Sequence, residues 1–185
     1  MKLRLLEIEK DFSVIKNWIT DEKSHAMWCA DLMHYPLEIT NFKEVLFEAA
    51  ERFGDIPYVA VTDEGDVVGF YSYSYNKETN EGMFKFVVVD PEYRGKGIAG
   101  NMLRLAISNA FMNPEIKLVH LNVFPENIRA KKCYEKIGFV ERNTTPNAFA
   151  FKSELWGRCN MIIQKWNYNF YDEYNIEVYG EKQNG

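Results

Sequence analysis

Residues 87–100 of the chain read VVVDPEYRGKGIAG and join an apolar segment to a helical pattern. Residues 83–89 are apolar enough at their end to form a strand buried on both faces. The glycines allow a tight turn in which several backbone N–H groups can point into one cavity. The pattern from Gly97 to about Phe111 predicts a helix whose first amides and positive dipole end favour phosphate. We therefore predict a phosphate-binding loop, the alternative being an exposed glycine-rich turn with basic residues.

Two other nucleotide-binding patterns fit the loop less well. Gly95, Gly97 and Gly100 have the GxGxxG spacing of a dinucleotide-binding fingerprint. That fingerprint needs its glycines directly after the strand and an acidic residue about twenty positions later. Here residues 90–93 intervene, and residues 120–122 contain no acid, which disfavours a nicotinamide-dependent enzyme. A P-loop is excluded because no Gly-Lys-Ser/Thr closes the segment.

The hydrophobic patterns on both sides of the loop predict one mixed α/β domain over residues 1–165. Antiparallel strands come first, with a turn at residues 63–66, and a β-α-β-α-β order follows. The aromatic and acidic segment 166–185 is expected to be an extension that could add a strand. We expect strands at residues 1–8, 56–62, 67–75, 83–89, 117–123, 139–142 and 160–165, and helices at 11–20, 40–53, 97–111 and 128–137.

The composition excludes several classes of protein. The 185 residues are 46% hydrophobic and carry a net charge of −5, which disfavours broad contact with nucleic acid or anionic lipid. No apolar run approaches the roughly 18 to 20 residues needed to span a bilayer, and the N-terminal residues alternate unlike a signal peptide. The three cysteines have no metal-ligand spacing. We expect a cytoplasmic protein without a bound metal.

Two motifs resemble a known family. Arg94, Gly97 and Ala99 fill the pyrophosphate-loop pattern Arg/Gln-x-x-Gly-x-Gly/Ala of the GCN5-related N-acetyltransferases (GNAT). Residues 127–139, NIRAKKCYEKIGF, match a second block of that family in the right order and spacing. The resemblance implies a mostly antiparallel sheet flanked by helices, with a splayed strand pair holding acetyl-CoA. Residues 28–40 are similar to the branch of ribosomal-protein N-terminal acetyltransferases.

The resemblance also implies how the site is built. An amine attacks the thioester of acetyl-CoA directly, without a covalent enzyme intermediate. The backbone of Val87, Val88 and Val89 would contact the pantetheine arm, and one of those N–H groups would polarise the thioester carbonyl. Asn127 and, less strongly, Asn122 would hydrogen-bond the cofactor. The residues expected to hold the pyrophosphate are Arg94, Gly95, Lys96, Gly97, Ile98, Ala99 and Gly100.

Proton transfer needs an acid and a base. Tyr134 of the second motif is the candidate general acid, because a phenol with a pKa of about 10 can protonate a departing thiolate; the alternative is a core tyrosine. Many relatives carry a glutamate near the position of Met83. Glu81 has the same strand parity and is the candidate base, although ordered water could serve instead. The remaining side chains that could act as the base are His25, Asp31, His34 and His120.

The acceptor is expected to be a primary amine of a small molecule or of a protein N-terminus. The alternative is a non-catalytic acyl-CoA sensor on the same fold. The aromatic end of the chain could also support a homodimer. Side chains that could line an acceptor pocket are Trp28, Tyr35, Tyr71, Tyr73, Phe149, Phe151 and Trp156.

Overall fold

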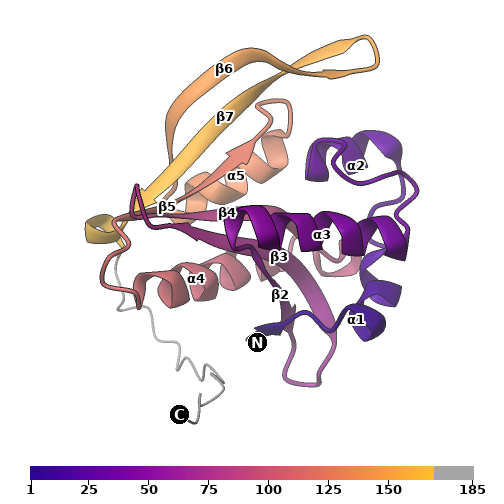
Figure 1. The fold of residues 1–185 in the computed structure, drawn as a ribbon, viewed down its shortest axis with the longest axis horizontal. Coiled ribbons are helices and arrows are strands. Elements are labelled where there is room, and N and C mark those ends of the chain that lie inside the picture. Colours follow the sequence, from indigo (N-terminus) through magenta and orange to yellow (C-terminus); the bar gives the residue numbers. More distant parts are fainter. Residues whose placement is uncertain (169–185) are drawn as a thin grey trace.

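A seven-stranded sheet forms the centre of the computed structural model, which describes residues 1–168. Neighbouring strands run in the order β1-β2-β3-β4-β5-β7-β6, and only the β4–β5 pair is parallel (Figure 1). This arrangement confirms the predicted mixed fold with a mostly antiparallel sheet. The strands are β1 (Lys2–Leu5), β2 (Ile56–Val61), β3 (Val67–Asn76), β4 (Glu81–Val89), β5 (Leu118–Val123), β6 (Val140–Phe151) and β7 (Glu154–Gln164).

Helices cover both faces of the sheet (Figure 1). On one face, Phe42 and Leu46 pack with Phe70 of β3 in one apolar cluster. On the other face, Met102 and Ile107 pack in a second cluster. Burying these stripes is what holds the layers together, because it removes apolar surface from water. The first face carries α1 (Ile8–Ile15), α2 (Glu22–Cys29) and α3 (Ile39–Phe53), and the second carries α4 (Ile98–Phe111) and α5 (Ile128–Ile137).

Most helix ends follow the sequence signals. Gly54 and Gly138 end α3 and α5 with φ of 67° and 111°, a left-handed conformation that glycine adopts without strain. The expected start at Thr40 is wrong, because the helix begins at Ile39 after Glu38. Helix α2 was missed because its apolar periodicity is weak. Asp21 caps it, accepting a hydrogen bond from the Ser24 amide at 2.8 Å.

The β6–β7 hairpin is much longer than the short strands expected at residues 139–142 and 160–165. Nearly all of β6 is exposed at the edge of the sheet, so it has no alternation of buried and exposed residues to reveal it. The far end of the hairpin packs against α2, where Phe151 and Trp156 share a cluster with Ala26. The hairpin therefore bridges residues that are distant in the chain.

Strands β4 and β5 pair over only part of their length. The register runs from Glu81 opposite Leu118 to Phe84 opposite Leu121, and the strands separate beyond it. This separation is the splayed strand pair that the resemblance implied.

The expected C-terminal extension is described only at its start. Lys165–Asn167 form a short 3-10 helix, and the Tyr168 hydroxyl donates to the carbonyl of Arg104 at 3.0 Å. The expected extra strand falls on residues 169–185, outside the described residues. Within residues 1–168, no helix is both long and apolar enough to cross a membrane.

A buried ion pair ties β1 to α1. The Arg4 guanidinium donates two hydrogen bonds of 2.7 Å to the carboxylate of Asp11, and the Glu7 amide donates a third at 2.8 Å. Burial acts to raise the pKa of Asp11, but the bonds from Arg4 and Glu7 outweigh it and leave the pKa below its ordinary value.

We expect Asp11→Asn to lower the free energy of unfolding at pH 7 by about 3 kcal/mol, because it leaves Arg4 with only the exposed Glu7 carboxylate, 3.6 Å away, as a charge partner. A depressed folded pKa stabilises the protein above the unfolded pKa of about 3.9, and this contribution is lost as pH falls through the folded pKa. Urea unfolding at pH 7 and at pH 3 would measure both effects. Glu48→Gln, which breaks the exposed pair with Arg52, should cost under about 1 kcal/mol; equal costs would refute the assignment.

Candidate active site

A cleft of about 840 Å³ opens where β4 and β5 separate. Its walls come from the ends of these two strands, the loop before α4, and side chains of α2, α4 and α5. It therefore lies between elements from both helical layers. In the part of the chain that the structure describes, no group of three His, Cys, Asp or Glu side chains could hold a metal ion.

The glycine loop presents free backbone amides to this cleft. Gly95 and Gly97 have φ of 80° and 81°, which only glycine adopts readily. The Asn101 amide donates to the Gly97 carbonyl at 3.0 Å, as the first bond of the α4 ladder. The amides of Ile98 and Ala99 therefore precede the ladder and have no carbonyl of the helix to bind. Such a helix start favours an anion.

The charged side chains that line the cleft are all basic. No aspartate or glutamate of residues 1–168 is among its lining residues. Burial and the neighbouring Arg129 lower the pKa of Arg94, and this effect outweighs the opposing one of Asp90 and Asp21. The free amides and these cations fit a ligand with several phosphates, such as acetyl-CoA. The basic lining residues are Lys85, Arg94, Arg104, Arg129, Lys132 and Lys136.

Strand β4 carries a bulge beside the cleft. Its pairing with β3 shifts between Phe70 and Ser72, and Phe86 has a φ of 53°. The Trp28 indole N–H donates to the Phe86 carbonyl at 2.8 Å. The C=O and N–H of one trans peptide point in opposite directions. The Val87 N–H, in the same peptide as the Phe86 carbonyl, therefore points away from Trp28.

Tyr134 lies in the wall of the cleft on α5. The residue is 8% exposed, and its ring packs 6.1 Å from that of Phe139. Its hydroxyl has no hydrogen-bond partner within residues 1–168, although it lines the cleft. Burial raises the pKa of Tyr134, so the phenol is neutral at pH 7 and able to donate a proton.

Comparison of the sequence with known protein families shows to which family the chain belongs. A model of the acetyltransferase (GNAT) family matches residues 14–139, more than half of the chain.

The chain belongs to the GNAT family. It is an N-acetyltransferase that uses acetyl-CoA, as the motifs predict. The spermine/spermidine N(1)-acetyltransferase of Bacillus subtilis is 27% identical over 128 residues, which cover 65% of this chain and 84% of the relative. The aminoglycoside N(6')-acetyltransferase type 1 of Klebsiella pneumoniae is 26% identical over 155 residues, covering 77% and 75%.

The fold has a close match among solved structures. The spermidine N-acetyltransferase of Vibrio cholerae, crystallised with CoA and spermine, superposes with a TM-score of 0.74. The match covers 90% of this chain and 96% of that one at 22% identity, so it supports the fold. These similarities correct the expected ribosomal-protein branch. Trp28 and Tyr35, which suggested that branch, instead donate hydrogen bonds to the carbonyls of Phe86 and Thr20.

Most of the predicted GNAT site residues come together in the cleft. Lys96 does not: it is exposed, and its ammonium lies 5.1 Å from the centre of the Tyr93 ring. Cys133 is half-buried and lines the cleft; burial raises its pKa and keeps the thiol protonated. The predicted residues that line the cleft are Val87, Val88, Val89, Arg94, Gly95, Gly97, Ile98, Ala99, Gly100, Asn122, Asn127 and Tyr134.

Glu81, the candidate base, lies away from the cleft. It begins β4, where the strand still pairs with β5, and its carboxylate accepts a hydrogen bond of 2.9 Å from Arg142. His120 Nε2 lies 3.8 Å from the other oxygen. Glu81 does lie on the same face of β4 as Met83, as its strand parity predicts. However, β4 and β5 separate only after Phe84, so the cleft begins too far along β4 for the Glu81 side chain to reach it. The structure therefore does not bring Glu81 or His120 into the cleft wall.

The two asparagines have partners in the protein. The Asn127 side-chain oxygen caps α5 by accepting from the Ala130 amide at 3.2 Å, which leaves its amide nitrogen for a ligand. The Asn122 oxygen accepts from the Asn160 amide nitrogen at 2.9 Å.

Of the side chains expected around the acceptor, only Trp28 lines the cleft. Tyr71 and Tyr73 belong to the core cluster that contains α4. Phe149, Phe151 and Trp156 belong to the hairpin and pack together against Ala26 of α2. Sequence reasoning missed Met27 and Arg129 because it placed no helix at α2 and did not follow the basic face of α5.

We expect Gly97→Val to weaken acetyl-CoA binding at least about tenfold, because a left-handed valine is strained by about 1–2 kcal/mol and redirects the loop amides. Calorimetric titration would measure the affinity. Gly65→Val is the control, since Gly65 also has a positive φ, of 97°, but lies in the β2–β3 turn. Normal affinity of Gly97→Val would contradict the loop assignment.

We expect Trp28→Phe to lower kcat about fivefold with KM for acetyl-CoA unchanged, because the bulge loses one hydrogen bond worth about 1 kcal/mol. Steady-state kinetics would separate the two constants. Trp18→Phe removes a buried indole of the same cluster that does not line the cleft. A similar fall of kcat in both variants would mean that Trp28 acts only through packing.

Proposed function

We propose that this acetyltransferase transfers the acetyl group of acetyl-CoA to a primary amine of a small molecule. The observation that carries the proposal is Tyr134, which lines the cleft and whose hydroxyl has no partner among the described residues. The relatives named above support the acceptor class, since spermine, spermidine and aminoglycosides are small amines. The catalytic function is favoured over an acyl-CoA sensor, because these relatives are named as enzymes.

The loop and the basic side chains would hold the phosphates of the cofactor. Arg94 and residues 95–100 would bind the pyrophosphate through free amides and charge. The backbone of Val87–Val89 would run along the pantetheine arm, with the Asn127 amide nitrogen as a further donor. Bound acetyl-CoA supplies the thioester that reacts with the amine.

The chain's own groups would then act on charge and protons. The Val87 N–H, fixed by the Trp28 bond to Phe86, would polarise the thioester carbonyl. Tyr134 would donate its proton to the departing sulfur. No carboxylate or histidine of residues 1–168 lines the cleft, so the amine would lose its proton to water.

We expect Tyr134→Phe to lower kcat about 100-fold, the usual scale for losing a positioned acid, while the Kd for acetyl-CoA changes less than about twofold. Thiol release and calorimetry would measure the two quantities. Tyr58→Phe, a tyrosine that does not line the cleft, should keep full activity. Parallel losses of affinity and rate in Tyr134→Phe would show a structural role.

The proposed function itself is tested by titrating the purified protein with acetyl-CoA, with NADH as the parallel ligand, and then adding small amines. Binding of acetyl-CoA alone, followed by amine-dependent thiol release, is the expected result. Absence of binding by the folded protein would refute the assigned cofactor.

A further inference from the structure

We propose that the acceptor is a primary amine whose remaining part is apolar and carries no second cationic group. This inference rests on the proposed function and adds the chemical class of its acceptor. It comes from the distribution of charge around the cleft.

The two sides of the cleft differ in chemistry. The loop, α4 and α5 contribute five basic side chains, which suit the phosphates of the cofactor. Helix α2 contributes Met27, Trp28 and Ser24, none of them charged, and Phe86 lies beside them. Because the phosphates occupy the cationic side, the acceptor is left with the apolar side along α2.

Lys85, the remaining basic lining residue, already has a carboxylate that balances its charge. Its ammonium donates to the buried carboxylate of Asp55 at 2.6 Å and lies 4.4 Å from the centre of the Phe53 ring. It is therefore directed to partners within the protein, and Asp55 is not available to an acceptor.

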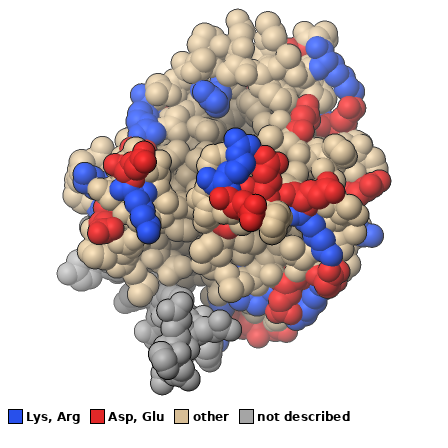
Figure 2. Space-filling model, viewed as in Figure 1, with Lys and Arg blue, Asp and Glu red and all other residues tan. Residues whose placement is uncertain are grey.

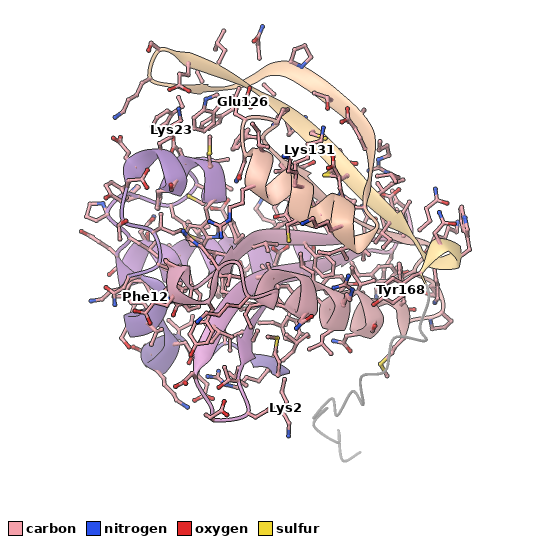
Figure 3. The ribbon with its side chains drawn as sticks, turned by 180° about the vertical axis from the view of Figure 1, so that it is seen from behind. Lys2, Phe12, Lys23, Glu126, Lys131 and Tyr168 are labelled. Atoms are coloured by element: carbon pink, nitrogen blue, oxygen red, sulfur yellow. The ribbon has the colours of Figure 1, made fainter. Side chains whose placement is uncertain are left out.

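Two carboxylates near α2 and the hairpin are also paired with cations. Glu154 accepts from Lys23 at 2.8 Å, and Glu22 accepts from Lys152 at 2.6 Å. Lys23 lies beneath the hairpin in Figure 3, where its ammonium reaches Glu154. Acidic and basic side chains lie next to one another on the face shown in Figure 2. Glu154 and Glu22 thus already have cations. The other carboxylates near α2 and the hairpin, Asp21, Asp31 and Glu126, do not line the cleft, so no carboxylate of residues 1–168 lies in its wall to meet an acceptor's ammonium.

A second ammonium in the acceptor would lose its water without gaining a counter-ion, which is strongly unfavourable. A cation–π contact could replace the carboxylate only at an open aromatic face. Trp28 already makes T-shaped ring contacts with His25, Phe70 and Phe86. An alkyl or aryl group gains from contact with Met27 and Trp28, because burial removes apolar surface from water.

The test compares hexylamine with 1,6-diaminohexane, which differ only by the second amine, and adds spermidine. Thiol release from acetyl-CoA gives kcat/KM for each. We expect hexylamine to exceed both others at least tenfold. Preference for the diamine or for spermidine would overturn the acceptor class while leaving the acetyltransferase function intact. No turnover with any amine, despite acetyl-CoA binding, would overturn both.

Two variants of Met27 test whether the absence of a carboxylate on the α2 side causes the preference for hexylamine. Met27→Glu adds an unpaired carboxylate to the α2 side, and Met27→Gln has the same size without charge. We expect Met27→Glu to raise the ratio of diamine to hexylamine kcat/KM at least tenfold, and Met27→Gln to change both substrates alike. Acetyl-CoA affinity shows that each variant is folded. An equal change of the ratio in both variants would refute the electrostatic argument.

Discussion

The separation of β4 from β5 after Phe84 is the constraint on which the cleft depends. Up to that rung the two parallel strands satisfy each other's backbone groups, and beyond it they do not. Backbone N–H and C=O groups away from water require partners, so a ligand with amide groups, such as pantetheine, suits the open strand ends. The bulge at Phe86 turns one peptide out of the strand pattern, and the Trp28 indole holds it in place. The orientation of the Phe86–Val87 peptide thus depends on helix α2, which lies on the face of the sheet opposite to α4 and α5.

Charge is distributed unevenly around this opening. Basic side chains of the loop, α4 and α5 line the cleft. Near α2 and the hairpin, Lys23 pairs with Glu154 and Lys152 with Glu22. A polyanionic cofactor and an uncharged acceptor tail can therefore occupy opposite sides without competing. The same pairs, together with the cluster of Ala26, Phe151 and Trp156, join α2 to the hairpin.

No carboxylate or histidine of the described residues lies in the cleft wall to act as the general base. The candidate from the sequence, Glu81, accepts a hydrogen bond from Arg142 and lies in the part of β4 that pairs with β5. Burial lowers the pKa of His120, but that side chain also stays outside the cleft wall. We therefore propose that the amine loses its proton to water.

The sequence by itself determined the glycine loop before α4, which we propose binds phosphate, because its glycines, its basic residue and the following helix are consecutive and act locally. It also determined the position of Tyr134, through the second motif, and the order of most strands and helices, through their periodicity. Only the tertiary structure decided where β4 and β5 part, that Trp28 meets Phe86 58 residues away, and that Glu81 is paired with Arg142 61 residues away. Such contacts depend on packing between distant segments, and the local pattern of residues does not record which distant side chains will meet.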